Sequence, residues 1–177
     1  MKRGEGMILL IGGPSHTGKT ALAHRLMQRE GVAYLSIDHL KMGLIRSGQT
    51  TLTPCDDDAL LTAYLWPILR EMIKTAIENK QSMIIEGCYI PFDWRKSFDD
   101  EYLPHIRAVW LVMTQRYLHE HGEDIRRYAN VIEDRVADEG FDIDKLAREH
   151  ARTLEKCRAH GCEVILIDEA YEVDVKL

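Results

Sequence analysis

The residues Gly-Pro-Ser-His-Thr-Gly-Lys-Thr at positions 13–20 decide the fold of this chain. They match the pattern Gly-x-x-x-x-Gly-Lys-Ser/Thr, in which x is any residue. The stretch follows the apolar run Met-Ile-Leu-Leu-Ile at 7–11 and precedes a helical pattern at 21–27. A strand before this pattern and a helix after it are the setting of a phosphate-binding loop, which a chance glycine-rich turn lacks. The sequence therefore predicts a nucleotide-binding protein.

Each specified position of this loop has a chemical reason. Gly13 and Gly18 let the backbone turn, so that successive amide N–H groups converge on phosphate oxygens at a helix N-terminus. Lys19 can reach the β- and γ-phosphates, and the Thr20 hydroxyl can bind Mg²⁺. We therefore predict a phosphate site over the whole loop, which consists of Gly13, Pro14, Ser15, His16, Thr17, Gly18, Lys19 and Thr20.

The composition limits the class of protein. The chain has 177 residues, which is near the usual size of one domain, and we expect a single domain over residues 1–177. A net charge of −6 argues against a broad nucleic-acid surface, and no apolar stretch approaches the roughly 20 residues that span a bilayer. The four cysteines form no Cys-x-x-Cys pair and are typical of reduced thiols. We expect a cytoplasmic protein without a structural metal, nucleic acid or membrane partner, and the oligomeric state stays open.

Apolar, strand-like runs alternate with helical patterns along the chain. The expected strands are short, continuous and rich in Ile, Val and Leu, as buried parallel strands are. They cover residues 7–12, 33–37, 82–86, 106–112 and 163–167. Helices are expected at 19–29, at 57–79 with a kink or restart at Pro67, and at 142–159. This alternation predicts a parallel sheet with helices on both faces.

Two carboxylates follow predicted strands, at the edge where open α/β sheets bind their ligands. Asp38 ends the Ser-Ile-Asp that follows the second strand, and Glu86 follows the apolar Met-Ile-Ile of the third. Glu86 is similar to the acid of a Walker-B strand, which helps to hold Mg²⁺. Two simpler interpretations stay open: Asp38 as the N-cap of a helix over 39–46, and Glu86 as a turn residue before Gly87.

The chain resembles the small P-loop kinases. The resemblance rests on the loop at 13–20, the Ser-Ile-Asp at 36–38, the Ile-Ile-Glu-Gly at 84–87 and an arginine-containing segment after the fourth strand. This group includes the shikimate, gluconate, nucleoside-monophosphate and adenylyl-sulfate kinases, with the zeta-toxin-like kinases as relatives. The loop together with Ser-Ile-Asp-His-Leu also resembles chains described as 2-phosphoglycerate kinases.

The resemblance implies a three-layer α/β fold whose five-stranded parallel sheet has the order 2-3-1-4-5. It also implies transfer of the γ-phosphoryl group of ATP, with Mg²⁺ as cofactor, to a small molecule. At Asp38 it implies a base for the acceptor hydroxyl, or a holder of Mg²⁺-bound water. The layout agrees over nearly the whole chain, but the loop alone is a highly specific motif.

The segment Thr114–Gly140 is rich in charge and poor in apparent core positions, and related kinases carry a mobile lid in this place. It supplies Arg116, Arg126, Arg127 and Arg135. In a lid, Arg126 and Arg127 would reach the phosphates, because they lie in its middle. The alternative is a solvated helix face with ion pairs between residues four apart. Both interpretations stay open.

The acceptor should bind opposite the phosphate loop, in the segments that follow the second and third strands. The candidate side chains are Asp38, Lys41, Arg46, Tyr89 and Arg95. Three of them are permanent cations, which suits an acceptor with a phosphate or carboxylate group, such as 2-phosphoglycerate. The aromatic side chains in these segments could instead stack on a nucleoside.

Other functions remain open at this point. They are a nucleoside or nucleotide kinase, a zeta-toxin-like kinase of nucleotide sugars, and a regulatory ATPase without an acceptor. A Ras-like GTPase would need Asp-x-x-Gly after the third strand and Asn-Lys-x-Asp after the fourth, and the sequence has neither. Phosphate release without an added acceptor would separate the ATPase from the kinases.

Overall fold

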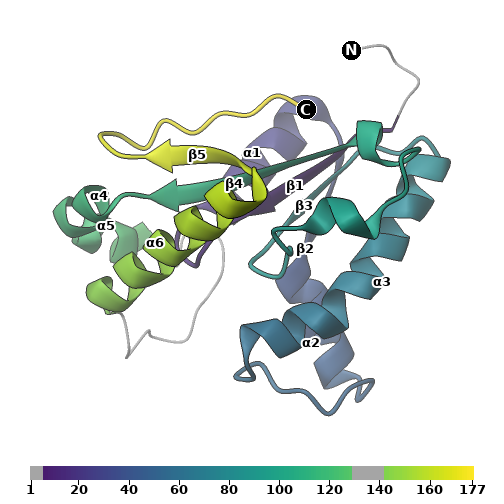
Figure 1. Ribbon diagram of the computed structural model, residues 1–177, viewed down its shortest axis with the longest axis horizontal. Helices are drawn as coiled ribbons and strands as arrows, with labels where there is room; N and C mark the ends of the chain where they lie inside the picture. Colours follow the sequence, from purple (N-terminus) through teal and green to yellow (C-terminus); the bar gives the residue numbers. More distant parts are fainter. Residues whose placement is uncertain (1–5, 129–141) are drawn as a thin grey trace.

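Parallel strands form one sheet at the centre of the protein (Figure 1). The computed structural model describes residues 6–128 and 142–177. The strands are β1 (Ile8–Gly12), β2 (Ala33–Ser36), β3 (Met83–Glu86), β4 (Ile106–Met113) and β5 (Glu163–Ile167). All pair in parallel, in the order β2-β3-β1-β4-β5. This confirms the predicted sheet, and each strand boundary lies within one residue of its prediction.

Helices cover both faces of the sheet. They are α1 (Lys19–Glu30), α2 (Ile37–Arg46), α3 (Asp58–Glu78), α4 (Gln115–Glu120), α5 (Gly122–Tyr128), α6 (Ile143–His160) and the short 3-10 helices η1 (Trp94–Ser97) and η2 (Leu103–His105). In the described ranges, no helix is long and apolar enough to cross a membrane.

The long helix α3 passes through Pro67 without a restart, so that alternative of the prediction was wrong. Proline removes one backbone N–H donor and disfavours a helix interior. Around it, however, Leu65, Trp66 and Leu69 are buried in the core. We attribute the continuity of α3 to this packing, which offsets the lost hydrogen bond.

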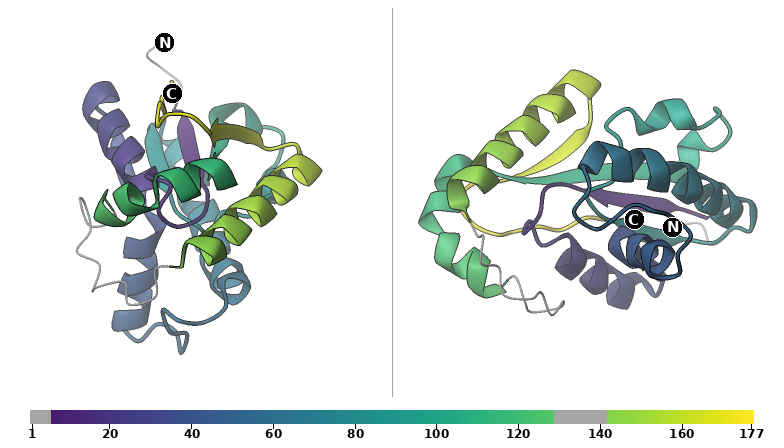
Figure 2. Two further views of the ribbon diagram at one scale, coloured as in Figure 1. Left: turned by 90° about the vertical axis from the view of Figure 1, so that its left-hand side faces the viewer. Right: turned by 90° about the horizontal axis from the view of Figure 1, so that it is seen from below.

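The central strand β1 is buried on both faces. Ile8 and Leu10 pack with side chains of α3, such as Leu69, whereas Leu9 and Ile11 pack with side chains of α1. Successive residues of a strand point to opposite faces, so one continuous apolar run serves two cores. Figure 2 (right) shows α1 and α3 on opposite sides of the sheet. This three-layer arrangement places the loop after β1 at the carboxyl edge of the sheet.

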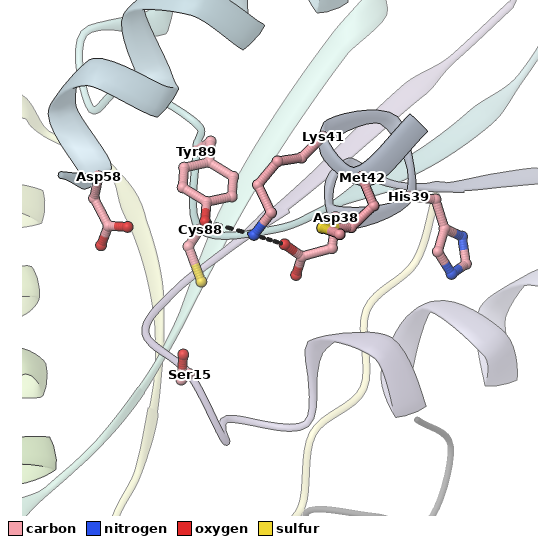
Figure 3. Close-up of a pocket in the computed structure, with 8 residues that line it drawn as sticks. All are labelled: Ser15, Asp38, His39, Lys41, Met42, Asp58, Cys88 and Tyr89. Atoms are coloured by element: carbon pink, nitrogen blue, oxygen red, sulfur yellow. Dashed lines mark hydrogen bonds and ion pairs between the residues drawn. The ribbon is translucent and has the colours of Figure 1, made fainter. Parts of the chain in front are cut away.

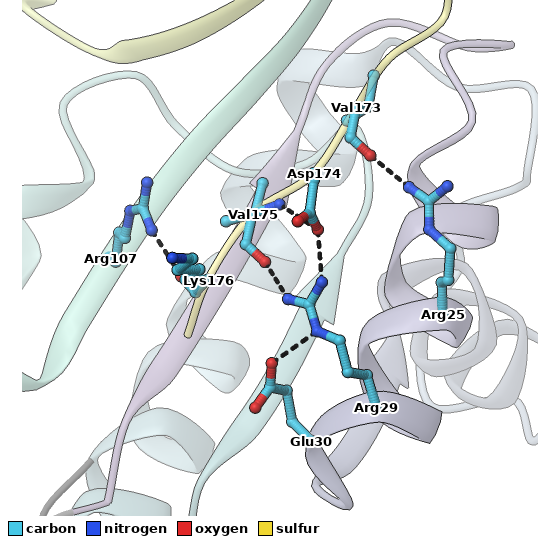
Figure 4. A network of polar contacts seen from close by, with 8 residues as sticks. All are labelled: Arg25, Arg29, Glu30, Arg107, Val173, Asp174, Val175 and Lys176. Atoms are coloured by element: carbon cyan, nitrogen blue, oxygen red, sulfur yellow. Dashed lines mark hydrogen bonds and ion pairs between the residues drawn. The ribbon is translucent and has the colours of Figure 1, made fainter.

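The segment after β5 runs back along α1, where backbone carbonyls accept hydrogen bonds from arginines (Figure 4). Arg25 donates to the carbonyl oxygen of Val173 at 2.5 Å, and Arg29 donates to that of Val175. Arg107 of β4 donates to the next carbonyl at 2.6 Å. Val173 and Val175 are buried in the core that α1 covers. The segment is therefore anchored to the helix that begins at the phosphate loop.

Candidate active site

The phosphate loop connects β1 to α1, and two of its glycines have conformations that other residues rarely adopt. Gly13 has φ 135° and Gly18 has φ 75°. A Cβ atom at Gly13 would lie 2.4 Å from the carbonyl oxygen of Leu111, and one at Gly18 would lie 2.1 Å from the Tyr171 hydroxyl. Gly13 therefore requires glycine for conformation and for space, and Gly18 requires it for conformation. The Tyr171 hydroxyl also donates a hydrogen bond to the Thr17 carbonyl at 2.9 Å.

The side chain of Lys19 is turned back into the loop. Its Nζ donates to the Pro14 carbonyl oxygen at 2.5 Å and to Thr17 Oγ1 at 3.4 Å, and Thr17 Oγ1 itself donates to the Pro14 carbonyl at 3.0 Å. The residue is buried, yet its ammonium lies among loop atoms and not in the apolar core. A phosphate oxygen could replace the neutral carbonyl as its partner, with a stronger, charge-assisted hydrogen bond.

The predicted Mg²⁺ ligands are in contact. Thr20 Oγ1 donates to Glu86 Oε1 at 3.3 Å, and the Tyr34 hydroxyl donates to the same oxygen at 3.1 Å. Glu86 is 3% exposed. Ser36 pairs with it in register, and the buried Ser36 Oγ has no hydrogen-bond partner in the described part of the chain. This set of hydroxyl and carboxylate oxygens fits a hard cation such as Mg²⁺.

The rest of a magnesium site would come from elsewhere. Among the residues that the structure describes, no cluster of three or more His, Cys, Asp or Glu side chains could hold a metal. Mg²⁺ usually takes one or two protein ligands and completes its shell with water and substrate phosphates. Thr20 and Glu86 therefore suffice for a metal that arrives with a nucleotide.

A cavity of about 350 Å³ opens beside the phosphate loop (Figure 3). It is enclosed by the loop, by α2, by the start of α3 and by the turn after β3. The lining residues are Ser15, Asp38, His39, Lys41, Met42, Asp58, Cys88 and Tyr89. The pocket thus contains three of the predicted acceptor-binding residues, Asp38, Lys41 and Tyr89, next to a residue of the loop.

Asp38 is not the N-cap of α2. The helix begins at Ile37, Ser36 occupies the N-cap position without a side-chain hydrogen bond, and Asp38 lies in the first turn. That simpler interpretation was wrong because the helix starts directly where β2 ends. The Asp38 carboxylate pairs with Lys41 Nζ at 2.5 Å, one turn further along α2.

Lys41 links two sides of the pocket. Its Nζ, paired with Asp38, also donates to the Tyr89 hydroxyl at 2.9 Å, as Figure 3 shows. Burial lowers the pKa of Lys41, but the hydrogen bonds to Asp38 and Tyr89 outweigh it, so the pKa lies above its ordinary value. Burial also raises the pKa of Tyr89, against the opposing effect of Lys41. At neutral pH, a charged Lys41 and a neutral Tyr89 therefore hold the Asp38 carboxylate in one orientation.

Two predicted acceptor-binding residues do not line the pocket. Arg46 is exposed in the last turn of α2, two turns beyond Asp38. Arg95 is exposed on η1, where its guanidinium lies 4.6 Å from the centre of the Trp94 ring. Both follow a strand in sequence, as predicted, but their positions on α2 and η1 leave the side chains outside the pocket. Asp58 lines the pocket but was not predicted to do so, because the helix dipole stabilises acids in the first turn of a helix without any ligand.

The first half of the predicted lid is helical and contributes to the core. Helices α4 and α5 lie at the carboxyl end of β4 (Figure 1). They bury Tyr117, Leu118 and Ile125, so this part of the segment is not poor in core positions, contrary to the expectation. The apolar pattern is hard to see in the sequence because six mostly polar and charged residues separate Ile125 from Tyr117 and Leu118.

The arginines of this segment differ in their surroundings. Arg116 pairs with Asp168 at 3.0 Å, beyond the end of β5. Arg126 and Arg127 are exposed on α5 and do not line the pocket. The other candidate, Arg135, lies outside the described residues, in the range 129–141. A contact between Arg126 or Arg127 and the phosphates stays a prediction.

A family model described as AAA domain matches residues 7–121, which include the loop, the pocket and both carboxylates. The chain belongs to this family. The match agrees with the P-loop nature of the fold and with the family resemblance seen in the sequence. A search of curated proteins found no significant match to this AAA-domain chain.

Solved kinase structures share the fold of this AAA-domain protein at low sequence identity. A gluconokinase from Sinorhizobium meliloti 1021 is 16% identical, with 96% of this chain and 85% of that chain covered and a TM-score of 0.52. A shikimate kinase from Bacteroides thetaiotaomicron is 18% identical, with coverages of 94% and 89% and a TM-score of 0.54. A sugar kinase from Janibacter sp. HTCC2649 is 18% identical, with coverages of 92% and 85% and a TM-score of 0.50. These likenesses confirm the predicted P-loop kinase fold.

Proposed function

We propose that this protein is a small-molecule kinase that transfers the γ-phosphoryl group of Mg-ATP to an acceptor hydroxyl. The observation that carries the proposal is that Ser15 of the phosphate loop and Asp38 of α2 line the same cavity of about 350 Å³. A nucleotide on the loop and an acceptor in this pocket would therefore meet. The gluconokinase, shikimate kinase and sugar kinase that share the fold support this reaction class.

The proposed reaction is an in-line displacement at the γ-phosphorus. The acceptor oxygen forms a bond to phosphorus, the bond from phosphorus to the β,γ-bridging oxygen breaks, and ADP leaves. The acceptor hydroxyl loses its proton to the carboxylate of Asp38, which the ion pair with Lys41 orients. Lys19 offsets negative charge on the phosphates. Thr20 and Glu86 would hold Mg²⁺, which would supply further charge neutralisation to the phosphates.

The charge of the pocket bears on the choice of acceptor. Among the described residues that line it, Lys41 is the one permanent cation, and it is already paired with Asp38. Asp58 adds a second carboxylate. A phosphate group on the acceptor would face these two acids, and like charges at short range are unfavourable. We therefore propose an acceptor that presents hydroxyl groups without a phosphate, such as a polyol or sugar, with 2-phosphoglycerate as the competing candidate.

The experiment is an assay of ADP formation with a panel of neutral polyols, sugars, sugar acids, nucleosides, nucleoside monophosphates and 2-phosphoglycerate. We expect a neutral, hydroxyl-rich acceptor to raise ADP formation well above the rate with ATP alone. If phosphate is released at one rate whatever is added, the protein is an ATPase without an acceptor. If 2-phosphoglycerate is the best acceptor, the charge argument is wrong.

A matched pair of variants tests the role of Asp38. We expect Asp38→Asn to lower kcat by about 10²-fold or more, the usual scale for loss of a general base, with little change in ATP affinity. Asp58→Asn makes the same chemical change in the same pocket. It should change KM for the acceptor and leave kcat within a few-fold. Equal kcat in both variants would remove Asp38 from the chemistry.

A further inference from the structure

A buried histidine that the proposed reaction does not use lies in α6. His150 is 1% exposed, and its Nδ1 accepts a hydrogen bond from the backbone N–H of Met113 at 2.8 Å. Because Nδ1 is an acceptor, the neutral ring carries its proton on Nε2. Nε2 has no hydrogen-bond partner in the described part of the chain. Buried donors are rarely left unpaired, so this one calls for a function.

The His150 ring lies beside the phosphate loop. Lys19, His16 and the backbone of Ser15 all act on its electrostatics, although its Nε2 forms no hydrogen bond within the described residues. Burial, followed by the charges of Lys19 and His16, lowers the pKa of His150 to about 4. At neutral pH the ring is therefore uncharged, and it offers the loop a single N–H donor without competing with Lys19 for phosphate.

The geometry of a peptide bond explains what this donor can do. In a trans peptide, the carbonyl oxygen and the following N–H point in opposite directions. A loop that aims its N–H groups at phosphate must therefore aim the linked carbonyls away from it, towards the protein interior. The carbonyl of Ser15 shares its peptide with the N–H of His16. A donor behind the loop that holds this carbonyl also sets the direction of that N–H.

We propose that His150 is a positioning residue for the nucleotide: its Nε2–H holds the Ser15 carbonyl, so that the His16 N–H faces the phosphates. The other side of the ring fixes this arrangement to the end of β4, through the Met113 N–H. The sheet thereby positions the loop through a side chain from a helix distant in sequence. The inference rests on nucleotide binding in the proposed function, but it does not depend on the identity of the acceptor.

Conservative variants separate this role from a purely structural one. In His150→Asn the amide oxygen can still accept from Met113, but the side chain is too short to reach the loop. We expect the Kd for Mg-ATP, measured by calorimetry, and the KM for ATP to rise by about 10-fold, the scale of one lost hydrogen bond. The KM for the acceptor should stay unchanged. His150→Gln, whose amide N–H₂ can extend to the position of Nε2, should restore part of the ATP affinity.

His160→Asn is the matched control. His160 is exposed at the C-terminal end of the same helix, where it stacks on Phe92 with ring centres 6.3 Å apart. This change should leave ATP affinity as it is. Wild-type ATP affinity in His150→Asn, or an equal loss in His150→Asn and His150→Gln, would overturn the inference. A wild-type protein that fails to bind Mg-ATP would instead overturn the proposed function.

The unmodified protein offers a second measurement, which stays valid if the variants do not fold. The ring N–H proton of His150 should move downfield in the NMR spectrum when Mg²⁺ and a non-hydrolysable ATP analogue bind, because the proposed hydrogen bond to the Ser15 carbonyl forms. A resonance that does not respond to a bound analogue would show that His150 does not act on the loop.

Discussion

The buried His150 should make the stability of the protein depend on pH in a defined window. Burial and the charges of Lys19 and His16 lower its pKa from 6.5 to about 4 in the folded state. The unfolded chain, with the ordinary value, binds the proton more readily. The contribution of this ring to stability is therefore fully present above pH 6.5 and is lost as the pH falls towards 4. A shift of this size corresponds to about 3 kcal/mol.

The perturbation that isolates this contribution is His150→Asn, because an amide does not titrate. Free energies of unfolding in urea, at pH 7 and at pH 4.5, give the stability of each protein. Between these two values the wild type should lose about 2 kcal/mol more than the variant, according to the linkage relation. The difference between the two proteins cancels the pH-dependent contributions of the acidic residues that both contain. His160→Asn, which replaces an exposed histidine, should lose as much stability between the two pH values as the wild type.

One result would refute the reasoning. If the wild type and His150→Asn lose stability in parallel between pH 7 and pH 4.5, the ring is not held neutral in the folded state. It would then take up a proton as readily as in the unfolded chain, and the protected, uncharged donor behind the phosphate loop would fail with it.

Two further predictions concern the metal site and α3. Glu86→Gln keeps the size of the side chain and an acceptor for Tyr34 but removes the charge. The Mg²⁺ concentration for half-maximal activity should therefore rise by about 10-fold. If a magnesium titration shows an unchanged Mg²⁺ requirement, Glu86 does not belong to the metal site. Asp57 caps α3 by accepting from the Ala59 N–H at 2.8 Å, so Asp57→Ala should cost about 1 kcal/mol in urea unfolding. A loss of activity without this loss of stability would contradict the capping role.

The strands and the loop could be predicted because their signals are local, whereas the sheet order was implied by the family resemblance alone. The apolar run before Gly13 and the acids Asp38 and Glu86 stand at strand ends, and parallel strands bring their carboxyl ends to one edge. The contact between Thr20 and Glu86, separated by 66 positions, follows from that rule. Arg46 and Arg95 show its limit. A position shortly after a strand does not say which way the following helix or turn directs the side chain.

His150 could have been found from the sequence, because it interrupts a pattern. In α6 the apolar positions Leu146, Ala147, Ala151 and Leu154 follow helical spacing, and His150 falls on the same face. A polar residue on the buried face of an amphipathic helix needs a partner, which makes it a candidate for function. The identity of that partner could not be predicted. It depends on how α6 packs against β4, and this packing is a tertiary property.

Ser15 links the two sites of the protein. Ser15 lines the acceptor pocket together with Asp38, and its backbone acts on the electrostatics of His150. Phosphoryl transfer requires the attacking oxygen to lie about 3 to 3.5 Å from phosphorus, and an error of about 1 Å costs much of the rate. A loop that is fixed from behind by α6 and β4 therefore sets both the direction of the phosphates and their distance from Asp38. The buried imidazole thereby affects the transfer step through the position of the loop alone, without touching either substrate.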